Sequence, residues 1–458
     1  MRTMYMQLVF GIFFILSMTQ VLHSQNFTGK WKLKTNILEL GEIEMILNFE
    51  QTSDSTFLAY SRPEAIKDVV SGLKYSLIKN KDVFKNGSIV HIYNGEIKND
   101  SLHGILTTPM INLYFSAKIK NEKMSGVLYG NNRDEYNFSF SASPFDKDAL
   151  NYDYPSLITE IKSTFQNHIY DAEILNSRRW KKFFKNLDAV GSKITDDLEL
   201  FFDFTVLSQN LKMSHINLIR HNPWDVSDEA PLHFEPLVTH KMIDSSTAYI
   251  QFYGFQLADT SIVRNFFKQI ITQQTPNLIF DFRGASGGDY SSMFLAQYLV
   301  SDTYEAGFFI GNTYYKKHRK LPDENTVLNL PVYNGKSLEE FVQTVLNDGL
   351  LRGKVTPDKE LHYKGNVYAL IDEYSASATE PISYFLKQHK LATLVGEKTA
   401  GAMLSSSPIT IRDDWTLVLP IADYYTSDRF RIEQKGVKPD IKIKSEEALD
   451  YVIDKIKK

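Results

Sequence analysis

Between residues 26 and 145, the chain alternates short apolar runs with turn-forming residues. The runs 43–49 and 112–119 are rich in β-branched and aromatic side chains, which favour strands. Asn94-Gly95 and the stretch 98–101 carry the Asn, Gly and Asp residues that are typical of turns. Strands at such regular spacing predict a β-rich accessory domain over residues 26–145, closed into a small barrel or a sandwich.

A helical period replaces this alternation further along the chain. Apolar residues recur every three or four positions, which predicts a helical segment over residues 150–215. Its three expected helices cover residues 155–170, 178–187 and 196–207.

From about residue 245 onward, apolar strands alternate with helices. Residues 277–281 and 366–372 each form an apolar run that is followed by small residues and then by a helical pattern. This alternation predicts an α/β core over residues 216–458. The predicted fold class is therefore multi-domain α+β: a β-barrel-like domain, a helical segment and an α/β core.

Composition limits the possible partners and catalytic groups. The 458 residues carry a formal net charge of -4, so a nucleic-acid partner is not expected. The chain has no cysteine, which excludes disulfides, thiolate catalysis and metal sites built on cysteine. It also lacks a His-Glu-x-x-His pattern, so we expect neither a bound metal nor a cofactor. The sequence leaves the oligomeric state open.

The first 24 residues are typical of a secretory signal peptide. A cationic start at Arg2 precedes a short apolar run over residues 8–16, and a polar stretch follows Ser24. An uncleaved membrane anchor is the alternative. No later apolar run reaches the length of a membrane span, so we expect an exported protein, periplasmic or secreted, without an integral span once the leader is removed.

A serine-rich turn follows the apolar run 366–372. Small residues over 375–378 precede Pro381, a residue well placed in the first turn of a helix. A serine at this junction is exposed by the turn and lies near the positive end of the helix, which suits a nucleophile. The alternative is that Ser375 and Ser377 only cap the helix.

Two further motifs supply candidate partners for a nucleophile. Adjacent glycines, Gly287 and Gly288, follow the run 277–281 and allow backbone N–H groups to approach an oxyanion. A phosphate loop is a poorer interpretation, because neither dinucleotide nor Walker spacing is present. Histidine has a pKa near neutrality and suits a general base, and Ser214-His215 offers one near the start of the core.

Four motifs together resemble the serine peptidases that include the tricorn protease and the carboxy-terminal processing (tail-specific) proteases. Residues 375–380 are similar to the family's Ser-Ala-Ser-Ala-Ser-Glu, with Thr379 in place of the last serine. The other three are similar to Asp-x-Arg-x-Asn-x-Gly-Gly, Gly-Glu-x-Thr-x-Gly and Gly-Val-x-Pro-Asp, and they occur in the family's order at residues 281–288, 396–401 and 436–440.

The resemblance implies roles for individual residues. It implies that Ser377 is the nucleophile, and that the N–H groups of Ala378 and of Gly287 or Gly288 form the oxyanion hole. The lysine base of the processing-protease branch falls on Ala402, so that dyad is absent. The tricorn-like branch instead uses a histidine preceded by serine, together with a glutamate. It therefore implies His215 as the general base and Ser214 and Glu433 as its partners, with Glu433 acting through Ser214 or directly.

The resemblance also implies a crotonase/ClpP-like α/β spiral core and a serine-type endopeptidase that acts on peptide or protein substrates. The segment between His215 and Asp281 is too short for a PDZ insert. Two alternatives stay open, namely a catalytically inactive peptide-binding homologue and an esterase that uses the same serine. The start of the β-rich domain, residues 27–33, resembles the first strand of lipocalin-like barrels, although an accessory domain without a ligand is the plainer interpretation.

Overall fold

The computed structural model describes residues 27–37, 41–61, 90–108, 111–130, 137–145, 153–192, 194, 196–220, 236–333, 337–412 and 415–458. The predicted signal peptide lies outside the described residues. The chain forms two compact units, Met1–Tyr152 with Lys193–Phe202 and Asp153–Ser192 with Asp203–Lys458. The domain boundaries near residues 145 and 215 stay predictions.

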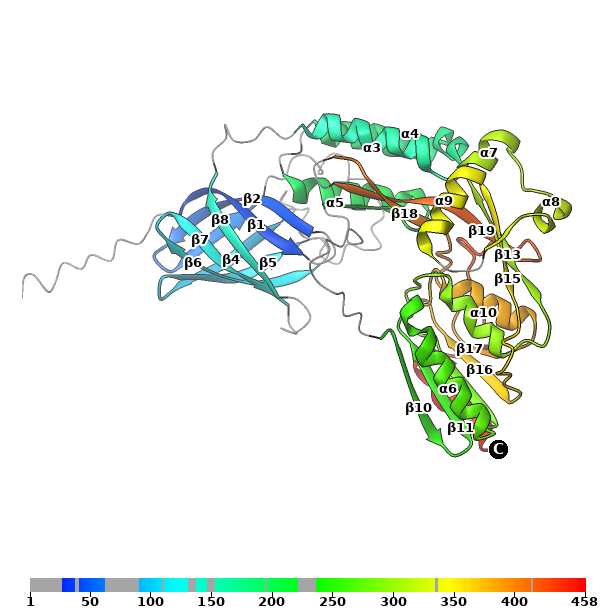
Figure 1. The fold of residues 1–458 in the computed structure, drawn as a ribbon. Coiled ribbons are helices and arrows are strands. Elements are labelled where there is room, and N and C mark those ends of the chain that lie inside the picture. The colour runs from blue at the N-terminus through cyan, green and yellow to red at the C-terminus, as the bar shows by residue number, and fades with distance from the viewer. Residues whose placement is uncertain are drawn as a thin grey trace, which may run out of the picture. The chain divides into compact units, whose positions relative to one another are not determined.

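The first unit is a closed barrel of eight antiparallel strands in sequence order, drawn in blue and cyan in Figure 1. Alternate residues point inward, and the rings of Phe49, Phe57 and Phe115 pack together inside it with their centroids 6.0–6.4 Å apart. The predicted β-barrel-like domain is confirmed. Its strands are β1 Gly29–Ile37, β2 Gly41–Ser53, β3 Thr56–Tyr60, β4 His91–Lys98, β5 Ser101–Thr107, β6 Asn112–Lys120, β7 Lys123–Tyr129 and β8 Asn137–Pro144.

One predicted turn of the barrel is wrong. Asn94 and Gly95 lie inside β4, and Gly95 pairs with Phe57 of β3. A side chain at Gly95 would overlap the ring of Phe57, so this glycine gives room to an aromatic side chain instead of forming a turn. The turn predicted at 98–101 is present, because Asn99 and Asp100 adopt positive φ between β4 and β5.

The three helices predicted between residues 150 and 215 are present. Asp153 caps α3 (Tyr154–His168) by accepting a hydrogen bond from the N–H of Ser156 at 3.0 Å, and Ser177 caps α4 (Arg178–Gly191) in the same way. Both helices belong to the second unit, and α5 (Asp197–Ser208) passes from the first unit to the second along the chain. The chain just after α3 is tied to β19, since the N–H of Tyr170 donates to the carbonyl of Pro420 at 3.0 Å.

The second unit is built on two sheets. The first has the order β10-β11-β12-β16-β17-β20, with β11 to β20 mutually parallel, and the second has the order β14-β15-β13-β19-β18, with β9 paired to β19. The strands are β9 Asn217–Ile219, β10 Val238–Asp244, β11 Thr247–Phe252, β12 Asn277–Asp281, β13 Tyr304–Gly311, β14 Val332–Tyr333, β15 Leu350–Val355, β16 Asn366–Ile371, β17 Thr393–Gly396, β18 Ser405–Thr410, β19 Thr416–Tyr425 and β20 Ile441–Lys442.

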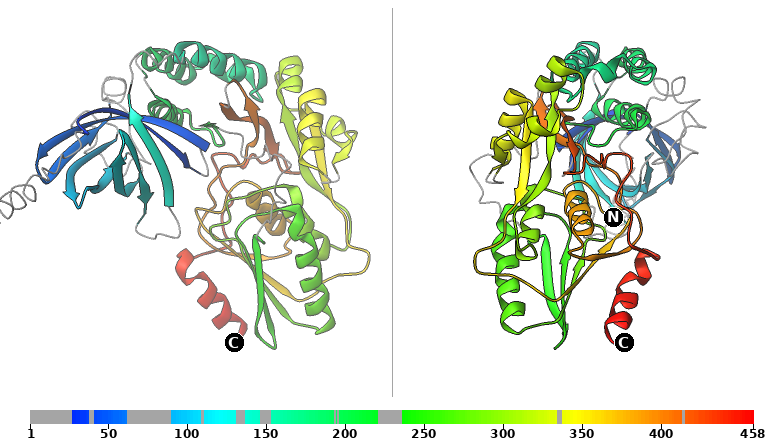
Figure 2. Two further views of the ribbon diagram at one scale, coloured as in Figure 1. Left: turned by 60° about the vertical axis from the view of Figure 1, so that its left-hand side comes forward. Right: turned by 90° about the vertical axis from the view of Figure 1, so that its right-hand side faces the viewer.

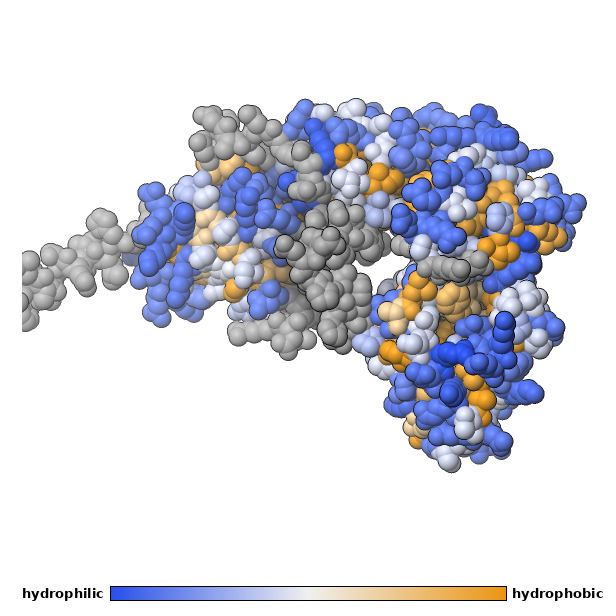
Figure 3. Space-filling view, viewed as in Figure 1, coloured by the Kyte–Doolittle hydropathy of each residue, from blue (hydrophilic) through white to orange (hydrophobic). Residues whose placement is uncertain are grey.

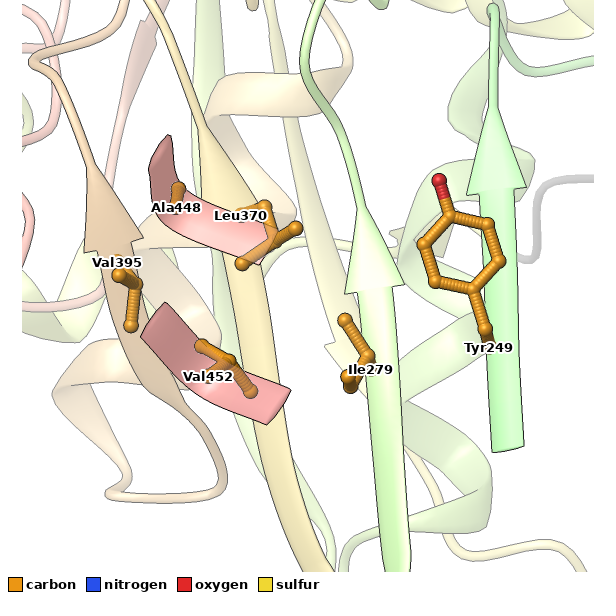
Figure 4. Close-up of a cluster of buried hydrophobic side chains, with 6 residues drawn as sticks. All are labelled: Tyr249, Ile279, Leu370, Val395, Ala448 and Val452. Atoms are coloured by element: carbon orange, nitrogen blue, oxygen red, sulfur yellow. The ribbon is translucent and has the colours of Figure 1, made fainter. Parts of the chain in front are cut away.

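Helices cover both faces of the parallel sheet, as the two views of Figure 2 show for α6 on one face and α11 on the other. Figure 4 shows the cluster beneath α11, in which Leu370 and Ile279 of the sheet meet Val452 of the helix. On the other face, Phe280 packs against Phe267 of α6. The remaining helices of this unit are α6 Thr260–Thr272, α7 Asn312–His318, α8 Glu324–Leu328, α9 Leu338–Asp348, α10 Thr379–Gln388 and α11 Ala448–Ile456.

Apart from the turn at Gly95, one expected element differs in type. The apolar helix expected after the glycine-rich turn is a 3₁₀ helix, Tyr290–Tyr298, which begins where Asp289 accepts a hydrogen bond from the N–H of Ser291. The predicted fold class as a whole, a multi-domain α+β chain, is confirmed. On the face drawn in Figure 3, hydrophilic residues predominate and apolar residues lie in small groups between them.

Strand β16 leads directly into the serine-rich turn, so its packing should govern the stability of this unit. Leu370 is fully buried beneath α11, and truncation to alanine removes contacts that a rigid core does not rebuild. Leu370→Ala should lower the free energy of unfolding by about 2–5 kcal/mol. Hydrogen exchange of peptides from β12 and β16 in increasing urea measures this change.

The matched control is Leu328→Ala. Leu328 lies on α8 with 43% of its surface exposed, so its truncation should change the same free energy by less than about 0.5 kcal/mol. Equal effects of the two substitutions would show that the sheet core does not set the stability of this unit.

Candidate active site

Ser377 sits on a sharp turn between β16 and α10. Its backbone is left-handed, with φ of 53°, a conformation that costs a residue with a side chain about 1–2 kcal/mol. Its N–H donates to the carbonyl of Ala402 at 3.0 Å, and its own carbonyl accepts from the N–H of Glu380. The turn is therefore held in a strained form that leaves the Ser377 side chain half-exposed.

Buried polar groups beneath this turn fix its shape. Asp372, at the end of β16, accepts hydrogen bonds from the N–H groups of Ser375 and Gly284. The hydroxyl of Ser375 lies against the carbonyl of Phe282 at 2.8 Å, and the N–H of Ala376 donates to the carbonyl of Ala285. The serine-rich turn and the glycine-rich turn are thus fastened to each other at the ends of two neighbouring parallel strands.

The structure brings His215 to the nucleophile candidate. His215 precedes β9, whose pairing with β19 anchors this part of the chain, and it too has a positive φ, of 61°. Its Nε2 atom lies 3.3 Å from the Oγ of Ser377, and its Nδ1 atom lies 2.8 Å from the Oγ of Ser214. The imidazole therefore stands between two serine hydroxyls that are 163 residues apart in the sequence.

Glu433 completes this set of hydrogen bonds and determines the tautomer of His215. The hydroxyl of Ser214 donates its single proton to Glu433 Oε2 at 2.9 Å, so it accepts from Nδ1–H of His215. A neutral His215 then presents the lone pair of Nε2 to the hydroxyl of Ser377, as a general base must. Glu433 thus contacts His215 through the hydroxyl of Ser214, and its role in catalysis stays a prediction.

Glu433 is itself held firmly. It is buried, and it also accepts hydrogen bonds from the N–H groups of Ser214 and Met403 and from the amide of Gln434. Four donors compensate for the removal of this carboxylate from water. Its orientation toward the hydroxyl of Ser214 is consequently well defined.

The predicted oxyanion donors surround Ser377. Gly287 contacts it so closely that a side chain at Gly287 would overlap the Cβ of Ser377. The carbonyl of Gly287 accepts from the N–H of Phe255, so the N–H of Gly288, in the same trans peptide, points away from Phe255. Within the described part of the chain, the N–H of Ala378 has no acceptor. The N–H of Ser377 is occupied by Ala402, which removes it from the candidate donors.

Among the side chains that the structure describes, the hydrogen-bond partner of the Ser377 hydroxyl is His215 and not a lysine. Lys398 has an exposed side chain, and the residue in the position where the resemblance expects the lysine base is Ala402. Among the described residues, no group of three His, Asp or Glu side chains is placed to hold a metal ion. The arrangement suits acyl transfer that relies on side chains and backbone N–H groups.

Sequence reasoning missed three contributors to this site. The sequence indicates Asp372 only as the end of an apolar run and Glu380 only as the last residue of a motif. The N–H of Met403, which holds Glu433, carries no sequence signal because any residue supplies a backbone donor. Glu380 could have been noticed, since an acidic residue in the first turn of an apolar helix interacts favourably with its positive end.

Burial determines the protonation of His215. Removal from water lowers the pKa of His215 below 6.5, and the charge of Glu433 opposes that change. Both effects act on the imidazolium form, so His215 is expected to be neutral at pH 7. A neutral imidazole is the form that accepts a proton from serine.

We expect the His215 ring resonances to titrate with a midpoint below pH 6.5, as measured by NMR on protein labelled in its histidine side chains. Glu433→Gln should lower that midpoint further, because it removes a negative charge that favours imidazolium. His215→Gln identifies the resonance among those of the 11 histidines. A midpoint above 6.5, or a rise in Glu433→Gln, would contradict this picture of the site.

Comparison with known proteins finds a family match over part of the chain, and that part includes Ser377 and Glu433 but not Ser214 or His215. Residues 246–443 match the family described as Peptidase family S41. Over 104 residues, the chain is 28% identical to Carboxyl-terminal-processing peptidase 1, chloroplastic, of Arabidopsis thaliana. That match covers 23% of this chain and about a fifth (21%) of the relative.

Solved structures of similar proteins include the photosystem II D1 C-terminal processing protease, with a TM-score of 0.41 and 14% identity, covering 65% of this chain and 94% of the other. They also include the tricorn protease, with a TM-score of 0.42 and 12% identity, covering 90% of this chain and 53% of the other.

Proposed function

We propose that this chain, which contains a domain of peptidase family S41, is a serine-type peptidase that forms an acyl-enzyme on Ser377 with His215 as general base. The observation that carries the proposal is one continuous set of hydrogen bonds, from Glu433 through Ser214 and His215 to the hydroxyl of Ser377. Capping of α10 alone would not require a histidine and a buried carboxylate in line with the serine.

In the proposed reaction, His215 Nε2 takes the hydroxyl proton while Ser377 Oγ attacks the scissile carbonyl. The negative charge on the carbonyl oxygen is held by the N–H groups of Ala378 and of Gly287 or Gly288. His215 then returns the proton to the leaving amine, and a water molecule hydrolyses the ester by the reverse sequence. Glu433 and Ser214 stabilise the imidazolium formed in each half-reaction and keep its ring oriented.

The finer assignment is a tail-specific or tricorn-like endopeptidase that acts on peptides or proteins. The motif order and the histidine preceded by serine support the tricorn-like branch. Ala402, in the position of the lysine base, speaks against the branch with a serine–lysine dyad. The name of the curated relative, a carboxyl-terminal-processing peptidase, supports a peptide substrate.

Ser377→Ala and His215→Ala should each lower kcat on a peptide substrate by about a thousandfold or more, because each removes one member of a single proton-transfer unit. The double variant should be no worse than either single variant. Glu433→Gln should cost less, on the order of 10–100-fold, since Glu433 orients the unit without transferring the proton. Cleavage of a peptide library, followed by mass spectrometry, provides the substrate and the rates.

Lys398→Ala is the control, because Lys398 is exposed. If Lys398→Ala abolishes cleavage while His215→Ala retains it, the assignment of the base is wrong. A fluorophosphonate probe separates the two alternatives. Labelling of Ser377 with ester hydrolysis but no peptide cleavage would establish an esterase, and the absence of labelling would establish an inactive homologue.

We also propose that the protein is exported. Arg2, the apolar run over residues 8–16 and the polar stretch after Ser24 support a cleaved leader. Across the part of the chain that the structure describes, no helix is long and apolar enough to cross a membrane. The proposed destination is the periplasm or the extracellular medium.

Intact-mass analysis of protein from its native host should find a mature chain that starts near Gln25. Loss of the positive start in Arg2→Glu should slow processing, because signal peptides depend on a cationic first region. A soluble cytoplasmic protein that retains Met1 would refute the proposal.

A further inference from the structure

Besides Asp372 and Glu433, a third buried acid, Glu380, lies beside the proposed catalytic unit. Glu380 is the second residue of α10, three residues after Ser377, and its side chain is fully buried. Its backbone N–H donates to the carbonyl of Ser377, while its carboxylate accepts hydrogen bonds from Thr399, Gly401 and Ala402.

The carboxylate of Glu380 holds the segment that follows β17. One oxygen accepts from the hydroxyl of Thr399 and from the N–H of Gly401 at 2.7 Å, and the other accepts from the N–H of Ala402 at 2.7 Å. The hydroxyl of Thr399 in turn accepts from the N–H of Val437. Charge-assisted hydrogen bonds of this length are strong, and here they are sheltered from water.

The same segment touches both ends of the proposed catalytic unit. The carbonyl of Ala402 accepts from the N–H of Ser377 at 3.0 Å, and the N–H of the next residue, Met403, donates to Glu433 at 2.8 Å. The carbonyl of Gly401 accepts from the N–H of Gln434 at 2.7 Å. Three consecutive N–H groups, those of residues 401–403, are thus shared between two buried carboxylates.

We infer that Glu380 is a positioning residue for the proposed peptidase. By fixing residues 399–402, it determines where the backbone of Ser377 and the carboxylate of Glu433 lie relative to each other. This inference rests on the proposed function. It assigns to the last residue of the serine-rich motif a role separate from proton transfer, and it gives the backbone of Ala402 a role where the resemblance expects a lysine side chain.

Protonation of Glu380 should loosen this arrangement. Burial is the main cause that raises the pKa of Glu380 to about 7, while its three donors lower it and the charge of Glu433 raises it further. The titratable group whose charge affects the pKa of Glu380 is Glu433, which lies across residues 401–403 from it. Because the raised pKa applies to the folded protein, the fraction that accepts all three hydrogen bonds decreases as the pH falls through about 7.

Glu380→Gln reproduces the protonated form, since an amide nitrogen cannot accept the N–H of Gly401 or Ala402. We expect kcat to fall about tenfold, the cost of one or two lost charge-assisted hydrogen bonds, while KM changes less than twofold. The acidic limb of the pH profile should move from near pH 7 down to the lower midpoint of His215. Fluorophosphonate labelling of Ser377 should slow by the same factor as kcat.

Two further variants separate positioning from folding. Thr399→Val should reproduce part of the fall in kcat. Thr399→Ser should keep kcat near the wild-type value, because serine retains the hydroxyl that bonds Glu380 and Val437. Glu397→Gln is the matched control: Glu397 lies in the same motif, is half-buried, and accepts from the N–H of Ser445 outside the site. It should leave rates and the pH profile unchanged.

Hydrogen exchange tests the inference even if the wild-type protein cleaves nothing. The peptide that contains Ser377 should exchange about tenfold faster in Glu380→Gln, or in Thr399→Val if the first variant does not fold, and at the wild-type rate in Glu397→Gln. Unchanged exchange at Ser377 and Met403 would overturn the inference. If the wild-type protein cleaves no peptide while Glu380→Gln still shows the faster exchange, only the proposed peptidase function is overturned.

Discussion

The parallel pairing of β12 with β16 brings the carboxyl ends of both strands to one edge of the sheet. From that edge leave the glycine-rich turn and the serine-rich turn, which Asp372 and Ser375 then fasten together. Parallel strands in such a sheet place their following loops side by side, where a ligand can meet both. The close approach of Gly287 to Ser377 follows from this pairing and from the absence of a side chain at Gly287.

The site is then completed by two segments that do not belong to this edge. β9 pairs with β19 of the second sheet and so carries Ser214 and His215 toward the nucleophile candidate. The residues after β17 pass beneath the serine-rich turn and bind its backbone through Ala402. In the proposed mechanism, the two sheets therefore contribute different parts: the parallel sheet supplies the serine and the oxyanion donors, and the mixed sheet positions the base.

Buried carboxylates are costly unless hydrogen bonds replace the water that they lose. Glu433 has four donors and Glu380 has three, and both draw on consecutive N–H groups of residues 401–403. The strain of a left-handed serine is tolerated because this scaffold determines its position several times over. Ala402, where the resemblance expects a lysine base, contributes its backbone N–H and carbonyl to this scaffold, and in the proposed mechanism His215 takes the role of base.

By itself, the sequence determined the local elements and the candidate residues. Helical spacing indicated α3, α4 and α5, and apolar runs indicated β12 and β16. The serine-rich motif indicated Ser377, and the resemblance to the tricorn-like branch implied His215, Ser214 and Glu433. These signals are local, because a residue's periodicity and its immediate neighbours carry them. The tertiary structure decided what depends on partners far along the chain. Gly95 became part of a strand because the ring of Phe57 needs its space, and Glu433 meets Ser214 across 219 residues. Glu380 has three hydrogen-bond partners that no spacing in the sequence predicts. Two of them are backbone N–H groups, which every residue except proline possesses.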